Sequence, residues 1–319
     1  MEYRSYGEII GSIIGGVYQD GIATKILQHM DRIRNMSDVS QARRWVMELL
    51  QNARDCSYKD TGVKVRIELK DNELVFSHSG KPFRIKDVLS VINQVTSKAS
   101  SEETIGQFGT GFMTTFLLSD SVTIHSVLKE EGLPYKPFTI RMDRSSNEKD
   151  GILAGIEKTM RELDQVDVSP EITDFNKEGY NTVFSYPLKD RYHYNIAKTG
   201  FEDLKETILY VMLFSTPLKE IELVSHEGGE RQVRYTRGED IAMGPALRIL
   251  TINNEGTLNG VKLNSEDNHI LYYTDNDLTL AAAYDSEKRF KVFSDKLPRI
   301  FADFPPYRGR RIPLPCHIE

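Results

Sequence analysis

The chain has 319 residues, with 41 lysines and arginines against 47 aspartates and glutamates, so its formal net charge is −6. This balance excludes a nucleic-acid affinity driven by bulk positive charge, although local basic patches stay open. No apolar run approaches the roughly 18 residues that a membrane-spanning helix needs, so we expect no membrane association. The two cysteines, Cys56 and Cys316, have neither metal-ligand nor redox spacing. Their low number is typical of a reducing compartment, and we expect a cytoplasmic protein.

The first part of the chain alternates between helical and strand patterns. Apolar residues recur at helical spacing between 22 and 33, and Ser37 is a candidate N-cap for a longer helix that ends near Tyr58. Period-two alternation over 63–69 and 74–78, with a turn at 71–72, predicts a β-hairpin. A further helix is predicted around 88–92, and strands around 122–126, 138–142 and 179–186.

The helix that ends near Tyr58 carries a polar stripe beside its apolar side. Glu48 and Asn52 are four residues apart, so a helix places a carboxylate and an amide oxygen side by side on one face. Gln51 and Asp55 extend this stripe. A solvated helix face is the alternative interpretation of the same pattern.

A glycine-rich loop at 105–112 favours the functional interpretation. Gly106, Gly109 and Gly111 lie within six positions, and the apolar run 112–118 follows at once, which predicts a loop that opens into a helix. Glycines permit close backbone approach and positive φ, and the loop amides together with a helix N-terminus favour an anion such as phosphate. A tight structural turn is the alternative.

In order and spacing, these two segments resemble the GHKL ATPases, which include the ninety-kilodalton heat-shock chaperones, MutL, type II topoisomerase ATPase domains and histidine kinases. The glycine loop is most similar to the chaperone branch, and within that branch the chain most resembles sacsin-type ATP-binding modules. The resemblance covers roughly residues 15–190. It implies an α+β fold of the Bergerat type, a two-layer α/β sandwich in which helices cover a mixed sheet, followed by a smaller α/β transducer-like domain.

The resemblance also implies that the chain binds ATP and Mg²⁺. Asn52 would bind the metal, and Glu48 would orient and deprotonate the attacking water as general base. Lys98, in the polar segment 96–104 that corresponds to the ATP lid, would reach the phosphates, unless it is an ordinary surface lysine. Thr182 matches a threonine that relatives place near adenine, or it is a strand threonine without a role. The loop residues that would contact nucleotide are Gly106, Gln107, Phe108, Gly109, Thr110, Gly111 and Phe112.

The end of the site that would bind the base departs from the family. Most GHKL proteins place an aspartate at the start of an Asp-x-Gly-x-Gly turn to accept the adenine amino group, whereas residues 78–82 read His-Ser-Gly-Lys-Pro. We expect neutral His78, beside Gly80, to accept that hydrogen bond, with affinity falling below a pH of about 6.5, the ordinary histidine pKa. Alternatively, His78 only ends a strand, and adenine is contacted by Ser77, Ser79, Asp55 or a water.

The chain is long for one domain and suits two. Residues 1–195 are predicted to form the ATP-binding domain. Residues 196–297 are predicted to form a transducer-like domain, in which a helical face over 204–215 ends before Pro217 and short strands follow. The last part, 298–319, holds five of the 12 prolines and a basic run at 308–311, and is predicted to be a tail or a truncated boundary.

These features predict an ATP-hydrolysing conformational switch with slow turnover and a nucleotide-controlled lid. Its partners would be ATP and ADP, a protein partner or client, and, in a nucleotide-dependent homodimer, a second copy. A nucleotide sensor that docks a partner with little turnover is the alternative. A histidine kinase is disfavoured because no phosphoacceptor helix pair precedes the module.

Overall fold

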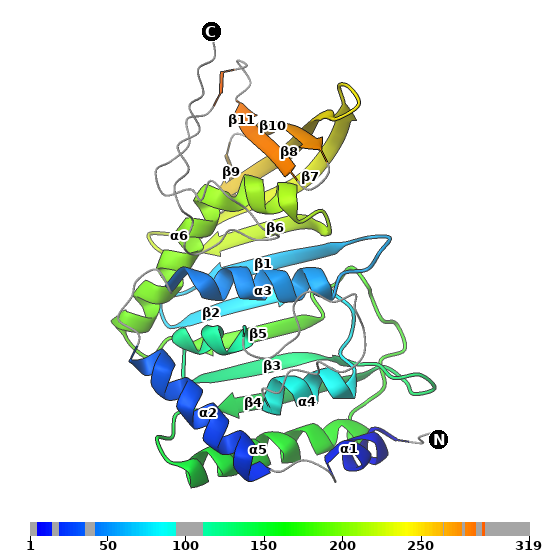
Figure 1. Ribbon diagram of the computed structural model, residues 1–319, viewed down its shortest axis with the longest axis vertical. Coiled ribbons are helices and arrows are strands. Elements are labelled where there is room, and N and C mark those ends of the chain that lie inside the picture. Colours follow the sequence, from blue (N-terminus) through cyan, green and yellow to red (C-terminus); the bar gives the residue numbers. More distant parts are fainter. Residues whose placement is uncertain are drawn as a thin grey trace.

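The computed structural model describes residues 5–14, 19–35, 42–93, 111–263, 265–275, 278–284 and 289–290. These residues form an α+β fold built on one large, mostly antiparallel sheet (Figure 1). The helices are α1 (Tyr6–Ile14), α2 (Gln19–Arg34), α3 (Arg44–Asp55), α4 (Ile85–Asn93), the 3-10 helix η2 (Phe112–Leu117), α5 (Lys149–Leu163), the 3-10 helix η3 (Asp164–Val168) and α6 (Arg191–Phe214). The strands are β1 (Val63–Leu69), β2 (Glu73–His78), β3 (Ser121–Leu128), β4 (Lys136–Asp143), β5 (Thr182–Pro187), β6 (Leu218–Ser225), β7 (Arg231–Ala242), β8 (Leu247–Leu258), β9 (Val261–Lys262), β10 (Glu266–Asp275) and β11 (Leu278–Tyr284).

The strand order of the sheet is β11-β10-β8-β7-β6-β1-β2-β5-β3-β4, and β9 pairs with β8. The predicted hairpin is confirmed as β1 and β2, whose register places Val65 opposite His78. On its other side β1 pairs with β6 in parallel, with Ile67 beside Leu223. The other strand pairs of the described sheet are antiparallel. The sheet therefore continues from the N-terminal strands into the C-terminal ones through β1 and β6.

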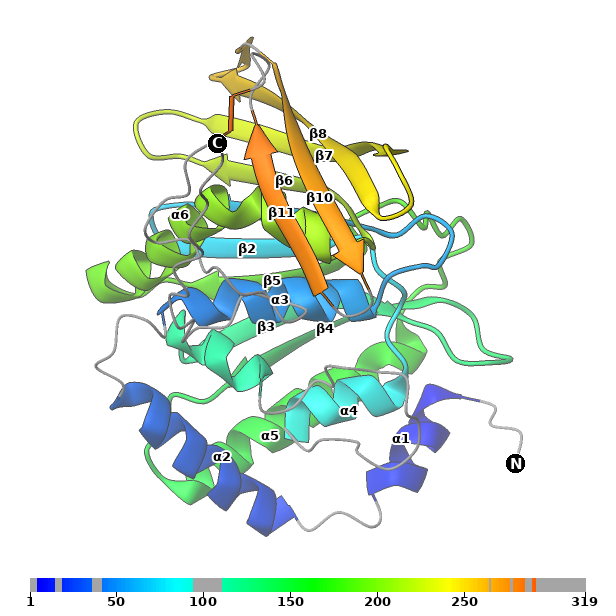
Figure 2. The same ribbon diagram turned by 45° about the horizontal axis from the view of Figure 1, so that its top comes forward.

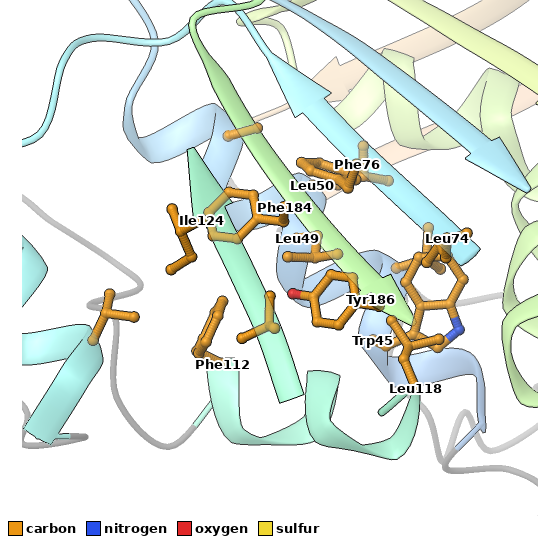
Figure 3. Packing of buried hydrophobic residues seen from close by; sticks show 14 of the residues in the cluster. Trp45, Leu49, Leu50, Leu74, Phe76, Phe112, Leu118, Ile124, Phe184 and Tyr186 are labelled. Carbon is orange, nitrogen blue, oxygen red and sulfur yellow. The ribbon is translucent and has the colours of Figure 1, made fainter. Parts of the chain in front are cut away.

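The helices α3, α4, η2 and α6 lie on one face of the sheet (Figures 1 and 2). Alternate residues of β1 are buried, as expected for a strand with one covered face. Figure 3 shows the core that results, in which the apolar side of α3 meets β2, β5 and η2. Burial of each large apolar side chain contributes roughly 1.5–3 kcal/mol. The labelled core residues are Trp45, Leu49, Leu50, Leu74, Phe76, Phe112, Leu118, Ile124, Phe184 and Tyr186.

The C-terminal strands curl over α6. Strands β10 and β11 pass in front of this helix in Figure 2, and their inward residues, with those of β8, are buried, namely Leu250, Ile252, Ile270 and Ala283. On its other side α6 packs against α3, where the Trp45 Nε1–H donates to the Ile196 carbonyl at 3.3 Å. The domain boundary predicted near residue 195 falls inside α6. The division into two units stays a prediction, and residues 298–319 lie outside the described residues.

A cluster of ionised side chains joins β1, β6 and β7 on the face opposite the helices. Glu222 of β6 is 1% exposed, and its carboxylate accepts hydrogen bonds from Arg66 Nη1 of β1 at 2.8 Å and Arg234 Nη2 of β7 at 2.7 Å. Gln232 Nε2 donates to the same carboxylate. A buried carboxylate is tolerated only when it is paired and hydrogen-bonded. The cluster therefore favours this attachment of β6 and β7 to β1 over other pairings.

Two predicted helices differ in detail from those observed. The helix that carries Glu48 begins at Arg44, and the predicted cap Ser37 lies outside the described residues. The apolar run after the glycine loop forms the six-residue 3-10 helix η2, whereas an α-helix was expected. None of the described helices combines the length and the apolarity needed to cross a membrane.

Candidate functional site

The helix α3 places Glu48 and Asn52 one turn apart, beside an apolar side that is fully buried. Asn52 is 6% exposed, and its Nδ2 has no hydrogen-bond partner among the described residues. Glu48 is half-buried. Burial raises the pKa of the Glu48 carboxyl, and the nearby Arg44 guanidinium opposes this shift. A carboxylate and an amide with spare hydrogen-bonding capacity thus share a poorly solvated strip of α3.

The described end of the glycine loop lies against this strip. A Cβ on Gly111 would be 2.2 Å from Glu48 Oε2 and 2.9 Å from Glu48 Cδ, so the backbone at Gly111 touches the carboxylate. Gly111 has a φ of −67°, which any residue adopts, so the expected positive φ is wrong at this position. A side chain at this position would collide with the Glu48 carboxylate, so glycine lets the carboxylate keep its observed position.

Two other expectations for the loop need correction. η2 is a short 3-10 helix, so it has too few aligned peptides to supply the potential for phosphate that was expected from an α-helix N-terminus. Phe112 is 2% exposed and packs on Phe184, with ring centroids 5.8 Å apart. Its side chain belongs to the core, so Phe112 could contact a ligand through its backbone only.

The residues expected at the base lie near the C-terminal end of α3. A Cβ on Gly80 would be 3.0 Å from Cys56 Cβ, and the Lys81 N–H donates to the Cys56 carbonyl at 2.7 Å. His78 ends β2 and lies opposite Thr182 of β5 on the helix-covered face. Both residues are buried, at 1% and 0% exposure. The structure therefore brings His78, Gly80 and Thr182 together beside α3.

The ring of His78 has a fixed orientation and a defined tautomer. It stacks on Phe184, with centroids 6.1 Å apart, and meets Phe76 edge-on. Its Nδ1 accepts a hydrogen bond from the Gly80 N–H at 3.0 Å, so in the neutral ring the proton is on Nε2. Nε2 has no hydrogen-bond partner among the described residues. The free ring nitrogen is thus a donor.

This geometry differs from the role expected for His78 from sequence. The nitrogen that could accept from an amino group is already used by Gly80, and the remaining nitrogen cannot accept. Burial lowers the pKa of His78 to about 4, so the ring stays neutral near pH 6.5. A change in affinity centred on pH 6.5 is therefore not expected from His78.

Thr182 has a partner that the sequence did not point to. Its Oγ1 lies 2.7 Å from Ser126 Oγ of β3, and both residues are fully buried. Ser126 could have been found from the alternating pattern of its strand. It lies two residues after buried Ile124, on the face where an apolar residue is usual. Because either hydroxyl can donate, the pair can present a donor or an acceptor to a ligand.

The alternative contacts for a base differ in how far they are engaged by the protein itself. Ser79 Oγ accepts from the Lys64 N–H at 2.9 Å. Ser77 alternates with His78 along β2 and so points to the opposite face of the sheet. Asp55, at the end of α3, forms an ion pair with Arg54 Nε at 3.1 Å. Ser77 and Ser79 are therefore unsuited to contact a base, whereas His78, Thr182 and the Asp55 carboxylate stay candidates at this end of α3.

The remaining predicted site residues lie outside the described residues, namely Lys98, Gly106, Gln107, Phe108, Gly109 and Thr110. Among the described residues, no group of three histidine, cysteine, aspartate or glutamate side chains is arranged to hold a metal ion. In comparisons with known proteins, the chain matches no protein-family model, and no curated protein matches it significantly.

The lowered pKa of His78 predicts a pH dependence of stability. The unfolded chain binds a proton at this residue with a pKa of about 6.5 and the folded chain with a pKa of about 4, so acid favours unfolding. As the pH falls from about 6.5 to about 4, this residue should reduce the free energy of unfolding by about 3 kcal/mol. Urea denaturation at several pH values measures the slope.

The matched control is His125→Gln, because His125 is exposed on the other face of the sheet. This variant should keep the acid destabilisation of the parent, whereas His78→Gln should lose most of it. An unchanged slope in His78→Gln would show that another group binds the proton.

Proposed function

We propose that this protein is a nucleotide-driven conformational switch of the GHKL type, with a Bergerat-type fold, which binds ATP and Mg²⁺ and hydrolyses ATP slowly. The observation that supports this most is the contact between Glu48 of α3 and Gly111, one helical turn from buried Asn52. The helix and the glycine loop are far apart in the sequence and were expected to form one site. Their described parts lie against each other.

The arrangement of layers supports the same proposal. α3 lies along β1, β2 and β5, with helices on one face of the sheet (Figure 1). The candidate base contacts, His78 and Thr182, face α3 near its C-terminal end, and Glu48 and Gly111 meet nearer its middle. A nucleotide laid along α3 could therefore have its base at one end and its phosphates at the other.

Asn52 fits a site for magnesium and phosphate. Mg²⁺ prefers oxygen ligands and keeps several waters, so one amide oxygen and phosphate oxygens are a suitable shell. Asn52 Oδ1 would be the protein ligand, and the unpartnered Nδ2 would donate to a phosphate oxygen. When bound, the metal neutralises charge on the phosphate oxygens.

Glu48 fits a general base. Its raised pKa makes the carboxylate a stronger base toward a water molecule, and its half-buried position limits competition from solvent. The close approach of Gly111 leaves little space for a water beside the carboxylate, which favours slow turnover. The same closeness supports the second candidate, a nucleotide sensor that hardly hydrolyses its ligand.

The proposal includes a protein partner or client and a nucleotide-dependent homodimer. Exposed apolar side chains on the C-terminal strands support a protein partner, because clusters of this kind on a surface often mark interaction sites. They are Ile241, Met243, Leu247, Tyr273 and Leu280.

Replacing the proposed base tests the enzyme against the sensor. Glu48→Gln should reduce turnover by about 10²- to 10⁴-fold and leave the affinity for a non-hydrolysable ATP analogue close to normal. Phosphate release and calorimetry measure the two quantities. Glu157→Gln, at an exposed position of α5, is the control and should behave like the parent. Hydrolysis at the parent rate by Glu48→Gln would remove Glu48 from the mechanism.

The contact at Gly111 predicts a selective loss of turnover. Alanine fits the φ of this residue, so Gly111→Ala should change the free energy of unfolding by less than about 1 kcal/mol. Its methyl group must displace the Glu48 carboxylate, so turnover should fall about tenfold or more. In a Glu48→Gln background the same substitution should cause no further loss. If the losses of turnover in the two single variants multiplied in the double variant, Gly111 and Glu48 would not act together.

A further inference from the structure

The buried side chain of His78 has a donor, Nε2–H, that makes no hydrogen bond with the described residues. The Gly80 N–H fixes Nδ1 as an acceptor, and Phe76 and Phe184 hold the ring, so Nε2–H cannot turn to find another partner. A buried donor without a partner costs free energy, and a ligand acceptor would remove that cost. His78 therefore selects for an acceptor.

A second unpartnered donor lies on α3. Asn52 Nδ2 is also buried without a hydrogen-bond partner among the described residues. His78 ends β2 close to Cys56, the residue that follows α3, and Asn52 lies one turn earlier on that helix. Both unpartnered groups are donors, so they suit a ligand that is rich in acceptor oxygens.

Bases differ in what they present at the edge that His78 would meet. Adenine carries an amino group at C6, whose hydrogens would face the Nε2–H donor with no acceptor at that position. Guanine and hypoxanthine carry a carbonyl oxygen at C6, which accepts a hydrogen bond. The buried hydroxyl pair of Thr182 and Ser126, next to His78, can adapt to either base because either hydroxyl can donate.

We infer that the site prefers a 6-oxopurine nucleotide, guanine or hypoxanthine, over adenine, with His78 Nε2–H donating to the C6 carbonyl oxygen. This inference rests on the proposed function, because it assumes that a purine nucleotide binds along α3. In this inference the site recognises the C6 carbonyl oxygen of the base, and not the C6 amino group of adenine. The low pKa of His78 supports it, since the ring keeps one donor and one acceptor across the neutral range.

Calorimetry on the full chain with ATP, ITP and GTP tests the inference. ITP is the matched probe because it lacks the extra amino group of GTP. ITP should bind roughly 5- to 100-fold more tightly than ATP, the range expected when a buried donor gains an acceptor in place of another donor. ATP binding as tightly as ITP, or more tightly, would overturn the base preference and leave the proposed function standing. No binding of any of the three would overturn both.

Variants at His78 connect the preference to this residue. His78→Asp supplies an acceptor and should reverse the ratio of ITP to ATP affinity. His78→Asn can present a donor or an acceptor through its amide, so it should bring the ratio close to one. It is also the variant to measure if the buried carboxylate of His78→Asp prevents folding. His125→Asn, on the exposed face of β3, should keep the ratio of the parent. A parental ratio in His78→Asn would overturn the role of His78.

Discussion

The helix α3 is buried on several sides, and this burial determines how its polar residues are presented. Trp45, Leu49 and Leu50 are fully buried in the core beneath α3 (Figure 3), and Ala53 of the same helix is fully buried as well. The helix contacts the sheet, η2 and α6. On the α6 side, a Cβ on Gly200 would be 2.3 Å from Trp45 Nε1. The indole of Trp45 therefore packs directly on the backbone of α6. A helix held this closely cannot rotate to solvate its polar stripe.

The consequence is electrostatic. Burial raises the pKa of Glu48 and lowers that of His78, so at both ends of the candidate site it favours the uncharged form. The same loss of solvent leaves donors on Asn52 and His78 without hydrogen-bond partners in the part of the chain that the structure describes. Interactions with a charged ligand are stronger in such an environment than in water. The packing that stabilises the fold thus also buries the polar groups that, in the proposed function, would bind a metal and phosphates.

The local parts of this arrangement could be predicted from sequence. Period-two alternation gave the β1–β2 hairpin, and helical spacing placed Glu48 and Asn52 on one face of a helix. Features that depend on distant pairing could not be predicted in this way. The parallel junction of β1 and β6 and the curl of β10 and β11 over α6 depend on contacts between remote segments. The tautomer of His78 depends on one hydrogen bond from Gly80, and the partner of Thr182 on the register of two strands.

Mg²⁺-dependent binding tests most directly whether buried Asn52 and half-buried Glu48 form a triphosphate site. Calorimetry would compare a non-hydrolysable nucleoside triphosphate with and without Mg²⁺ on the parent, Asn52→Ala and Asn72→Ala, the last in the exposed β1–β2 turn. We expect saturable binding that Mg²⁺ strengthens in the parent and in Asn72→Ala, and we expect Asn52→Ala to lose this metal dependence. Absence of binding by the parent, or the same metal dependence in Asn52→Ala, would contradict this expectation.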